Sequence, residues 1–154
     1  MGQDNATNLY EEVDTLPVTH EVGVKDVNKF IDAILRFFVD KGTLYISSYD
    51  FGYWADRLSC FRSPDRVKLK TSWASGAFLE NGLTITDEFI YVFLTECVRN
   101  IDAKRTFNQF LVYREGQPLL QCCSNFDDVF VNTKVPQSVI KAMTQNDIIT
   151  FWNK

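Results

Sequence analysis

The residues able to carry out acid–base or nucleophilic chemistry are few in this sequence. It has one histidine, His20, and four cysteines, Cys60, Cys97, Cys122 and Cys123. A catalytic cysteine needs a neighbouring base, and the histidine lies in an acidic stretch far from every cysteine in sequence. The cysteines also lack the paired spacing of metal ligands. We therefore interpret them as buried structural thiols and expect no catalytic residue, no bound cofactor and no metal.

Paired carboxylates occur at Asp127 and Asp128. Neighbouring side chains on a strand point to opposite faces, so these two are not both directed at one substrate atom. The surrounding Ser-Asn-Phe-Asp-Asp run is typical of a polar turn. The pair therefore predicts a turn rather than an acid–base site.

The most unusual stretch is residues 49–66, where aromatic and charged side chains alternate without a clear place in a sheet. Loops longer than about 12 residues are commonly functional or disordered, and the aromatic content opposes disorder. Tyr, Trp and Arg also dominate binding hot spots. We predict a partner-binding surface made of Tyr49, Asp50, Phe51, Tyr53, Trp54, Asp56, Arg57 and Arg62. The alternative is that the aromatic residues fill an edge of the core around a short helix from Tyr53 to Ser59.

The total charge is acidic: 16 basic against 20 acidic residues give a net charge of -4 and a pI near 5.0. This charge repels phosphate backbones, so we expect no binding to duplex nucleic acid. The basic and aromatic residues between 57 and 70 leave single-strand binding as an alternative. The acidic groups expected to pair with lysine or arginine of a partner are Glu11, Glu12, Asp14, Asp50, Asp56, Asp127 and Asp128.

Apolar spacing predicts three helices that would support such a surface. The first covers residues 27–38 behind the cap Asp26, and Gly42 is expected to stop it in a left-handed conformation. The second begins at Thr86, and its apolar stripe continues to Ile101. The third opens at Pro136, since proline is well tolerated at the first helical position.

Strands are predicted at residues 43–48, 67–73 and 147–152, and residues 107–132 read as a three-stranded meander with turn-formers between its strands. The order of elements predicts an α+β fold: a mostly antiparallel sheet of about five to six strands with two to three helices on one face. We expect the other face to be bare and open to a partner. Residues 1–24 are expected to form a partly ordered acidic arm before one domain, residues 25–154.

A chain of 154 residues with 45% hydrophobic content can bury a substantial core, so it needs no metal or disulfide to fold. The first residues lack a basic start followed by an apolar run, which predicts no signal peptide. No apolar run approaches the roughly 20 residues of a membrane span. Together with the unpaired cysteines, these features indicate a cytoplasmic protein with no membrane partner.

This combination is typical of a non-catalytic, protein-binding protein. The leading hypothesis is a bacterial immunity protein that neutralises a basic toxin, such as a nuclease, by occluding its active site. One alternative is a secretion chaperone of the type III kind. Another is a small hydrolase or transferase with its site in residues 49–66, using Asp50 or Asp56 with an arginine. The sequence does not indicate the oligomeric state.

Overall fold

The computed structural model of the chain describes residues 10–12, 19–48, 57–63, 68–70, 78–79, 82–99, 102–115 and 117–152. The main feature is a seven-stranded sheet in which every neighbouring pair is antiparallel. Its strands, in spatial order, are β10 (Ile149–Trp152), β2 (Thr19–Val24), β9 (Asp128–Asn132), β8 (Gln117–Cys123), β7 (Phe107–Arg114), β3 (Thr43–Ser48) and β6 (Gly82–Thr84). The predicted meander is confirmed and forms the middle of this sheet.

A second, three-stranded sheet joins β1 (Tyr10–Glu12), β4 (Lys68–Lys70) and β5 (Phe78–Leu79), with β1 parallel to β4. The strand predicted at residues 67–73 therefore belongs, as β4, to this small sheet and not to the main one. The main sheet instead gains β2 and β6, which brings it to seven strands. The predicted α+β class is confirmed, with a sheet larger than expected.

Strand β2 lies within residues 1–24, the stretch predicted to be a partly ordered arm. Thr19–Val24 pairs with both β9 and β10 inside the main sheet. The sequence signal of this strand is weak because, of its described side chains, only that of Val22 is fully buried. Its position comes from pairing with residues more than a hundred positions away, which local sequence patterns do not reveal.

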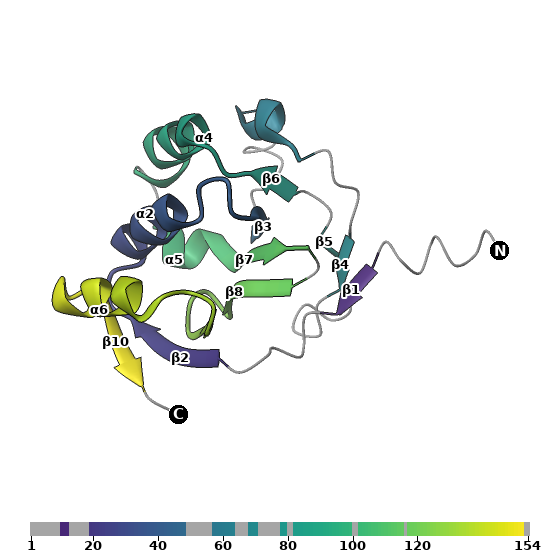
Figure 1. The fold of residues 1–154 in the computed structure, drawn as a ribbon. Coiled ribbons are helices and arrows are strands. Elements are labelled where there is room, and N and C mark those ends of the chain that lie inside the picture. Colours follow the sequence, from purple (N-terminus) through teal and green to yellow (C-terminus); the bar gives the residue numbers. More distant parts are fainter. Residues whose placement is uncertain are drawn as a thin grey trace.

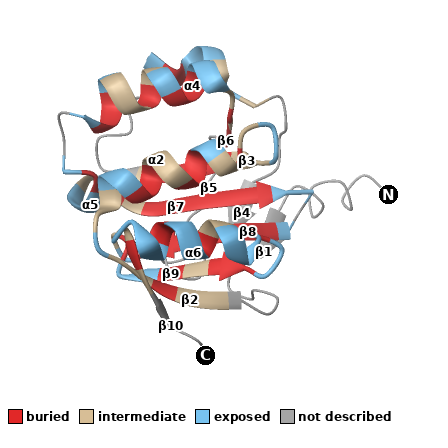
Figure 2. Ribbon diagram, turned by 60° about the vertical axis from the view of Figure 1, so that its left-hand side comes forward, coloured by how far each residue is buried: buried red, intermediate tan, exposed pale blue. Residues whose placement is uncertain are grey.

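The α-helices lie on one side of the main sheet, as predicted (Figures 1 and 2). They are α2 (Val27–Phe37), α4 (Asp87–Val92) with the π-helix η2 (Phe93–Val98) continuing it, the short α5 (Ala103–Thr106) and α6 (Gln137–Gln145). A 3-10 turn, η1 (Ser59–Phe61), precedes β4. No helix in these ranges is long and apolar enough to cross a lipid bilayer.

The predicted helix caps are confirmed. The carboxylate of Asp26 accepts a hydrogen bond from the Lys29 backbone N–H, and the Thr86 hydroxyl accepts one from Phe89 N–H, at 3.1 and 3.0 Å. Pro136 stands at the N-cap, one position before the first helical residue where it was expected. The side chains of Asp26 and Thr86 thus satisfy N–H groups that have no partner within the helix.

The left-handed stop predicted at Gly42 is wrong. Asp40 is the residue with positive φ after α2, at 58°. Glycine at position 42 serves close packing instead, because a Cβ there would lie 2.7 Å from Val112 Cγ1 and 3.1 Å from the Tyr113 carbonyl oxygen. The loop from α2 into β3 thus passes directly against β7.

The core between helices and sheet is largely aromatic. Phe93 of η2 stacks on Phe89 at 5.2 Å between ring centroids and packs against Phe107 of β7 at 5.7 Å. Phe110 of β7 lies 5.7 Å from Phe126, which meets Phe30 of α2 edge to face. Burial of such rings is a dominant stabilising contribution, and Figure 2 shows β7 buried along nearly its whole length.

The expected bare sheet face is not found on the central strands. Tyr45, Leu111, Tyr113 and Cys123 form a second buried cluster, separate from the core under the helices, in which Cys122 lies. The two adjacent cysteines therefore point to opposite faces, as predicted from strand geometry. Both faces of the central strands therefore carry buried side chains.

Candidate functional site

The predicted binding surface lies mostly outside the described residues. Tyr49, Asp50, Phe51, Tyr53, Trp54, Asp56 and Asp14 are outside them. Glu11 and Glu12 belong to β1, where they pair with Leu69 and Lys70 of β4. Besides these two, the described members are Arg57, Arg62, Asp127 and Asp128.

The two arginines lie beside η1. The Nε atom of exposed Arg57 is 4.0 Å from a carboxylate oxygen of Glu96, and Arg62 forms an isolated β-bridge with Leu83 of β6. Their neighbour Phe61 packs edge to face on Phe89, at 5.4 Å between centroids. For this end of the stretch, the alternative of aromatic residues at a core edge fits the packing of Phe61.

The two aspartates lie at the β8–β9 turn, as predicted. Both are exposed, and an oxygen of Asp127 is 3.4 Å from the Lys104 ammonium. Asp128 is the first residue of β9. No described contact joins Asp127 or Asp128 to the arginines beside η1. In the described part of the chain, the aspartates and the arginines therefore do not form one site.

The cysteines fit the prediction of structural thiols at three positions. Burial raises the pKa of Cys97 to about 11, that of Cys123 to about 12, and that of Cys122 well above its ordinary value. These thiols are therefore protonated, and weakly nucleophilic, near neutral pH. Cys60 is exposed. Within the described ranges, His, Cys, Asp and Glu form no group of three that could hold a metal ion.

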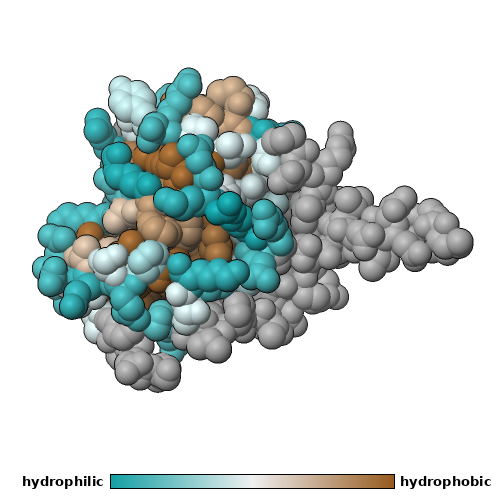
Figure 3. Space-filling model, in the orientation of Figure 1, coloured by the Kyte–Doolittle hydropathy of each residue, from teal (hydrophilic) through white to brown (hydrophobic). Residues whose placement is uncertain are grey.

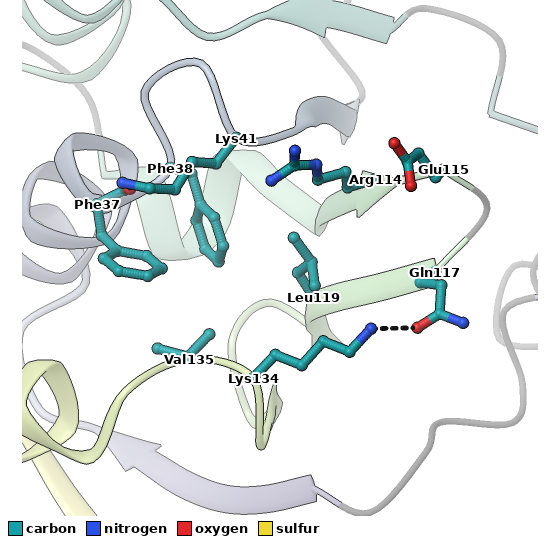
Figure 4. A pocket seen from close by; sticks show the side chains of 9 residues that line it. All are labelled: Phe37, Phe38, Lys41, Arg114, Glu115, Gln117, Leu119, Lys134 and Val135. Carbon is teal, nitrogen blue, oxygen red and sulfur yellow. Dashed lines mark hydrogen bonds between the residues drawn. The ribbon is translucent and has the colours of Figure 1, made fainter.

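A pocket of about 400 Å³ opens on the helix side of the molecule, between the end of α2, the β7–β8 turn and the loop from β9 to α6. Its lining residues are Phe37, Phe38, Lys41, Arg114, Glu115, Gln117, Leu119, Lys134 and Val135 (Figure 4). Figure 3 shows apolar surface in the middle of this face with hydrophilic side chains around it. We call this the cationic pocket, after its three basic side chains.

The floor of the cationic pocket is apolar. Phe38, Leu119 and Val135 are buried, and Phe37 is half-buried with its ring edge to face against that of Phe38, at 5.0 Å between centroids. Phe37 is the last residue of α2 and Phe38 is its C-cap. Leu119 comes from β8, and Val135 from the loop before α6. A floor built from three separate elements is held rigidly by their packing.

Three cations surround this floor. Lys41 donates a hydrogen bond to the Phe37 backbone oxygen at 2.9 Å and lies 4.7 Å from the centre of the Phe37 ring. Lys134 donates to the side-chain oxygen of Gln117 at 3.0 Å. Arg114 extends from the end of β7 toward Lys41 (Figure 4). None of the three forms an ion pair with a carboxylate of the described residues, whereas Arg36, Lys25, Lys104 and Arg105 do so elsewhere.

Sequence reasoning missed this pocket. Its residues come from segments that are far apart in the chain, so no local spacing connects them. One available signal was Phe37, an aromatic residue that lies outside the apolar stripe of the helix predicted at residues 27–38. Lys41 follows it four positions later. The other was the charged Arg-Glu-Gly turn at residues 114–116.

The lining of the cationic pocket contains no cysteine, serine, threonine or histidine, but it offers an apolar floor together with N–H donors at its rim. This arrangement can bind a molecule that is apolar on one side and anionic on the other. Comparison with protein-family models, with curated proteins and with solved structures found no match to this chain.

Proposed function

We propose that this chain is a non-catalytic, protein-binding protein that holds its partner partly through the cationic pocket. One observation carries the proposal: three basic side chains surround an apolar floor without a carboxylate partner among the described residues. Interface hot spots combine apolar contacts in a pocket with charged groups that find partners on binding. The buried thiols with raised pKa values favour binding over cysteine chemistry.

Within this class, the specific hypothesis is a cytoplasmic immunity protein that occludes the active site of a toxin. The exposed carboxylates of Asp127 and Asp128 are available to basic side chains of such a partner, and that of Asp127 already lies 3.4 Å from the Lys104 ammonium. The pocket adds a contact of the opposite sign. A partner with both basic and acidic groups at its interface would satisfy both surfaces, and such complementarity gives specificity and a high association rate.

The test is co-purification from the native host at native expression, with the wild type and with two pairs of matched variants. Arg114→Gln and Lys134→Gln remove rim charges of the pocket. Arg99→Gln and Lys141→Gln remove exposed cations elsewhere on the described surface. We expect one protein to be recovered with the wild type and with both control variants, and recovered several-fold less with the pocket variants.

Recovery of no specific partner would contradict the proposed function. Equal recovery with all four variants would contradict the role of the pocket. If a toxin is recovered, its activity should fall to zero at one equivalent of this protein, since occlusion is stoichiometric. An activity that falls only in part at saturation would contradict inhibition by occlusion.

A further inference from the structure

We propose that the cationic pocket recognises a short peptide segment in which an aromatic side chain is flanked by carboxylates. The inference rests on the proposed function, because it takes the ligand to be part of a protein partner. It adds to the proposed function the chemical character of the segment that is bound. The pocket selects acidic groups although the protein itself has a net negative charge.

The size and walls of the pocket favour one aromatic side chain. A volume of about 400 Å³ lies near the lower end of the range for small-ligand pockets, about 300–1,000 Å³. Phe37 and Phe38 already meet edge to face at an interplanar angle of 72°. A third ring entering beside them would extend this arrangement over the apolar side chains of Leu119 and Val135.

The rim favours a carboxylate. An ammonium group has three N–H donors, and Lys41 and Lys134 each use one in the described hydrogen bonds, to an uncharged oxygen in both cases. The side chain of Arg114 has five N–H donors, and none of them takes part in a described hydrogen bond. Replacing water by a carboxylate at these donors would form charge-assisted hydrogen bonds, which are stronger than those to neutral oxygens.

The position of Glu115 gives the pocket a direction. In Figure 4 this carboxylate lies beyond Arg114, at the end of the pocket opposite Lys41. It repels an anion at its own end and leaves the Lys41 end the more positive. The carboxylate of the ligand should therefore lie between Lys41 and Arg114, with the aromatic ring on the floor below it.

The inference can be tested by recording ¹H–¹⁵N correlation spectra of the full chain with capped tripeptides. The probes are N-acetyl amides of Glu-Phe-Glu, Gln-Phe-Gln, Lys-Phe-Lys and Glu-Ala-Glu, with adenosine monophosphate as a non-peptide anion. We expect Glu-Phe-Glu to shift the amide signals of Lys41, Arg114, Leu119 and Lys134 in a saturable way. Gln-Phe-Gln should bind about fivefold more weakly, the effect of losing exposed ion pairs.

Matched variants and salt locate the interaction. Arg114→Gln and Lys134→Gln should weaken Glu-Phe-Glu binding about threefold, whereas Arg99→Gln and Lys141→Gln should leave it unchanged. Adding about 0.5 M NaCl should weaken Glu-Phe-Glu and spare Gln-Phe-Gln, because salt screens exposed charges. The same spectra show whether each variant is folded.

Three results would overturn the inference: no saturable shift up to about 10 mM peptide, equal affinity for the Glu, Gln and Lys peptides, or tighter binding of adenosine monophosphate than of Glu-Phe-Glu. Its failure differs from failure of the proposed function. A partner recovered from cells and lost with Arg114→Gln, together with no peptide binding, refutes only this inference. Selective peptide binding with no recoverable protein partner supports the acidic–aromatic specificity and refutes the proposed function.

Discussion

The side-chain amide of Asn132 donates a 2.8 Å hydrogen bond to the backbone carbonyl of Pro118, joining the end of β9 to β8. Its oxygen accepts a second bond, also 2.8 Å, from the Lys134 backbone N–H. Asn132 is only 1% exposed, so its side-chain amide must find its partners within the protein. One buried side chain thus fixes the loop that carries Lys134 and Val135 into the pocket wall.

Replacing Asn132 by alanine should lower the free energy of unfolding by about 2 kcal/mol, because it leaves a buried carbonyl and a partly buried N–H without partners. Urea denaturation followed by circular dichroism measures the change. Thr133→Ala, at an exposed neighbouring position, is the control and should change stability by less than about 0.5 kcal/mol. A loss in Asn132→Ala no greater than in the control would show that these hydrogen bonds contribute little.

Glu115 is predicted to be a poor residue for its own turn. It has φ of 51° in the two-residue connection between the paired residues Arg114 and Gln117. Asparagine tolerates this conformation better than glutamate, so Glu115→Asn should raise the free energy of unfolding by about 0.5–1 kcal/mol. Glu115→Ala removes the same charge without that tolerance and should give no gain. An equal gain in both variants would attribute the effect to charge.

The helices were predictable because their signals are local. Asp26 and Thr86 precede apolar stripes of helical period, and both cap the helices as expected. The meander was equally readable, since Glu115 and Gly116 separate two strands rich in apolar residues. In each case, neighbours along the chain determine the structure.

The remaining features depend on distant contacts. β2 is a strand because it lies between β9 and β10, while its own pattern contains one fully buried described side chain, Val22. The π-helical turn over Phe93–Val98 adds a residue to the helical repeat, and an apolar stripe does not reveal such an insertion. The cationic pocket exists only once α2, the β7–β8 turn and the loop after β9 have come together.

The four cysteines should differ sharply in reactivity. At about pH 8, a disulfide reagent should react quickly with Cys60, because this thiol is exposed. It should react with the buried Cys97, Cys122 and Cys123 only as the chain unfolds. Absorbance of the released thiolate measures both phases. In about 6 M guanidinium chloride, the control, all four should react at once. Rapid reaction of a second thiol in the native protein would contradict the described burial.

Stability should decline in alkali partly through Cys97. Its pKa is raised to about 11 in the folded chain, by burial and then by Glu96, from an ordinary value of 9.0. The unfolded state therefore releases the thiol proton first, so this contribution is complete below about pH 9 and is lost as pH rises toward 11. Between about pH 8.5 and 10.5, wild type should lose more free energy of unfolding than Cys97→Ala. Equal losses of the free energy of unfolding in wild type and Cys97→Ala would exclude the Cys97 thiol as a cause of the decline.

Asn125 should stabilise the β8–β9 turn in two separable ways. Its φ is 56°, between Ser124 and Phe126 that are also left-handed, and its side-chain amide donates to the Lys104 carbonyl at 2.8 Å. Asn125→Ala loses both the hydrogen bond and the tolerance of positive φ, so the free energy of unfolding should fall by about 2 kcal/mol. Asn125→Gly keeps the tolerance and should lose about half as much. Equal losses in the two variants, measured by urea denaturation, would assign the whole effect to the hydrogen bond.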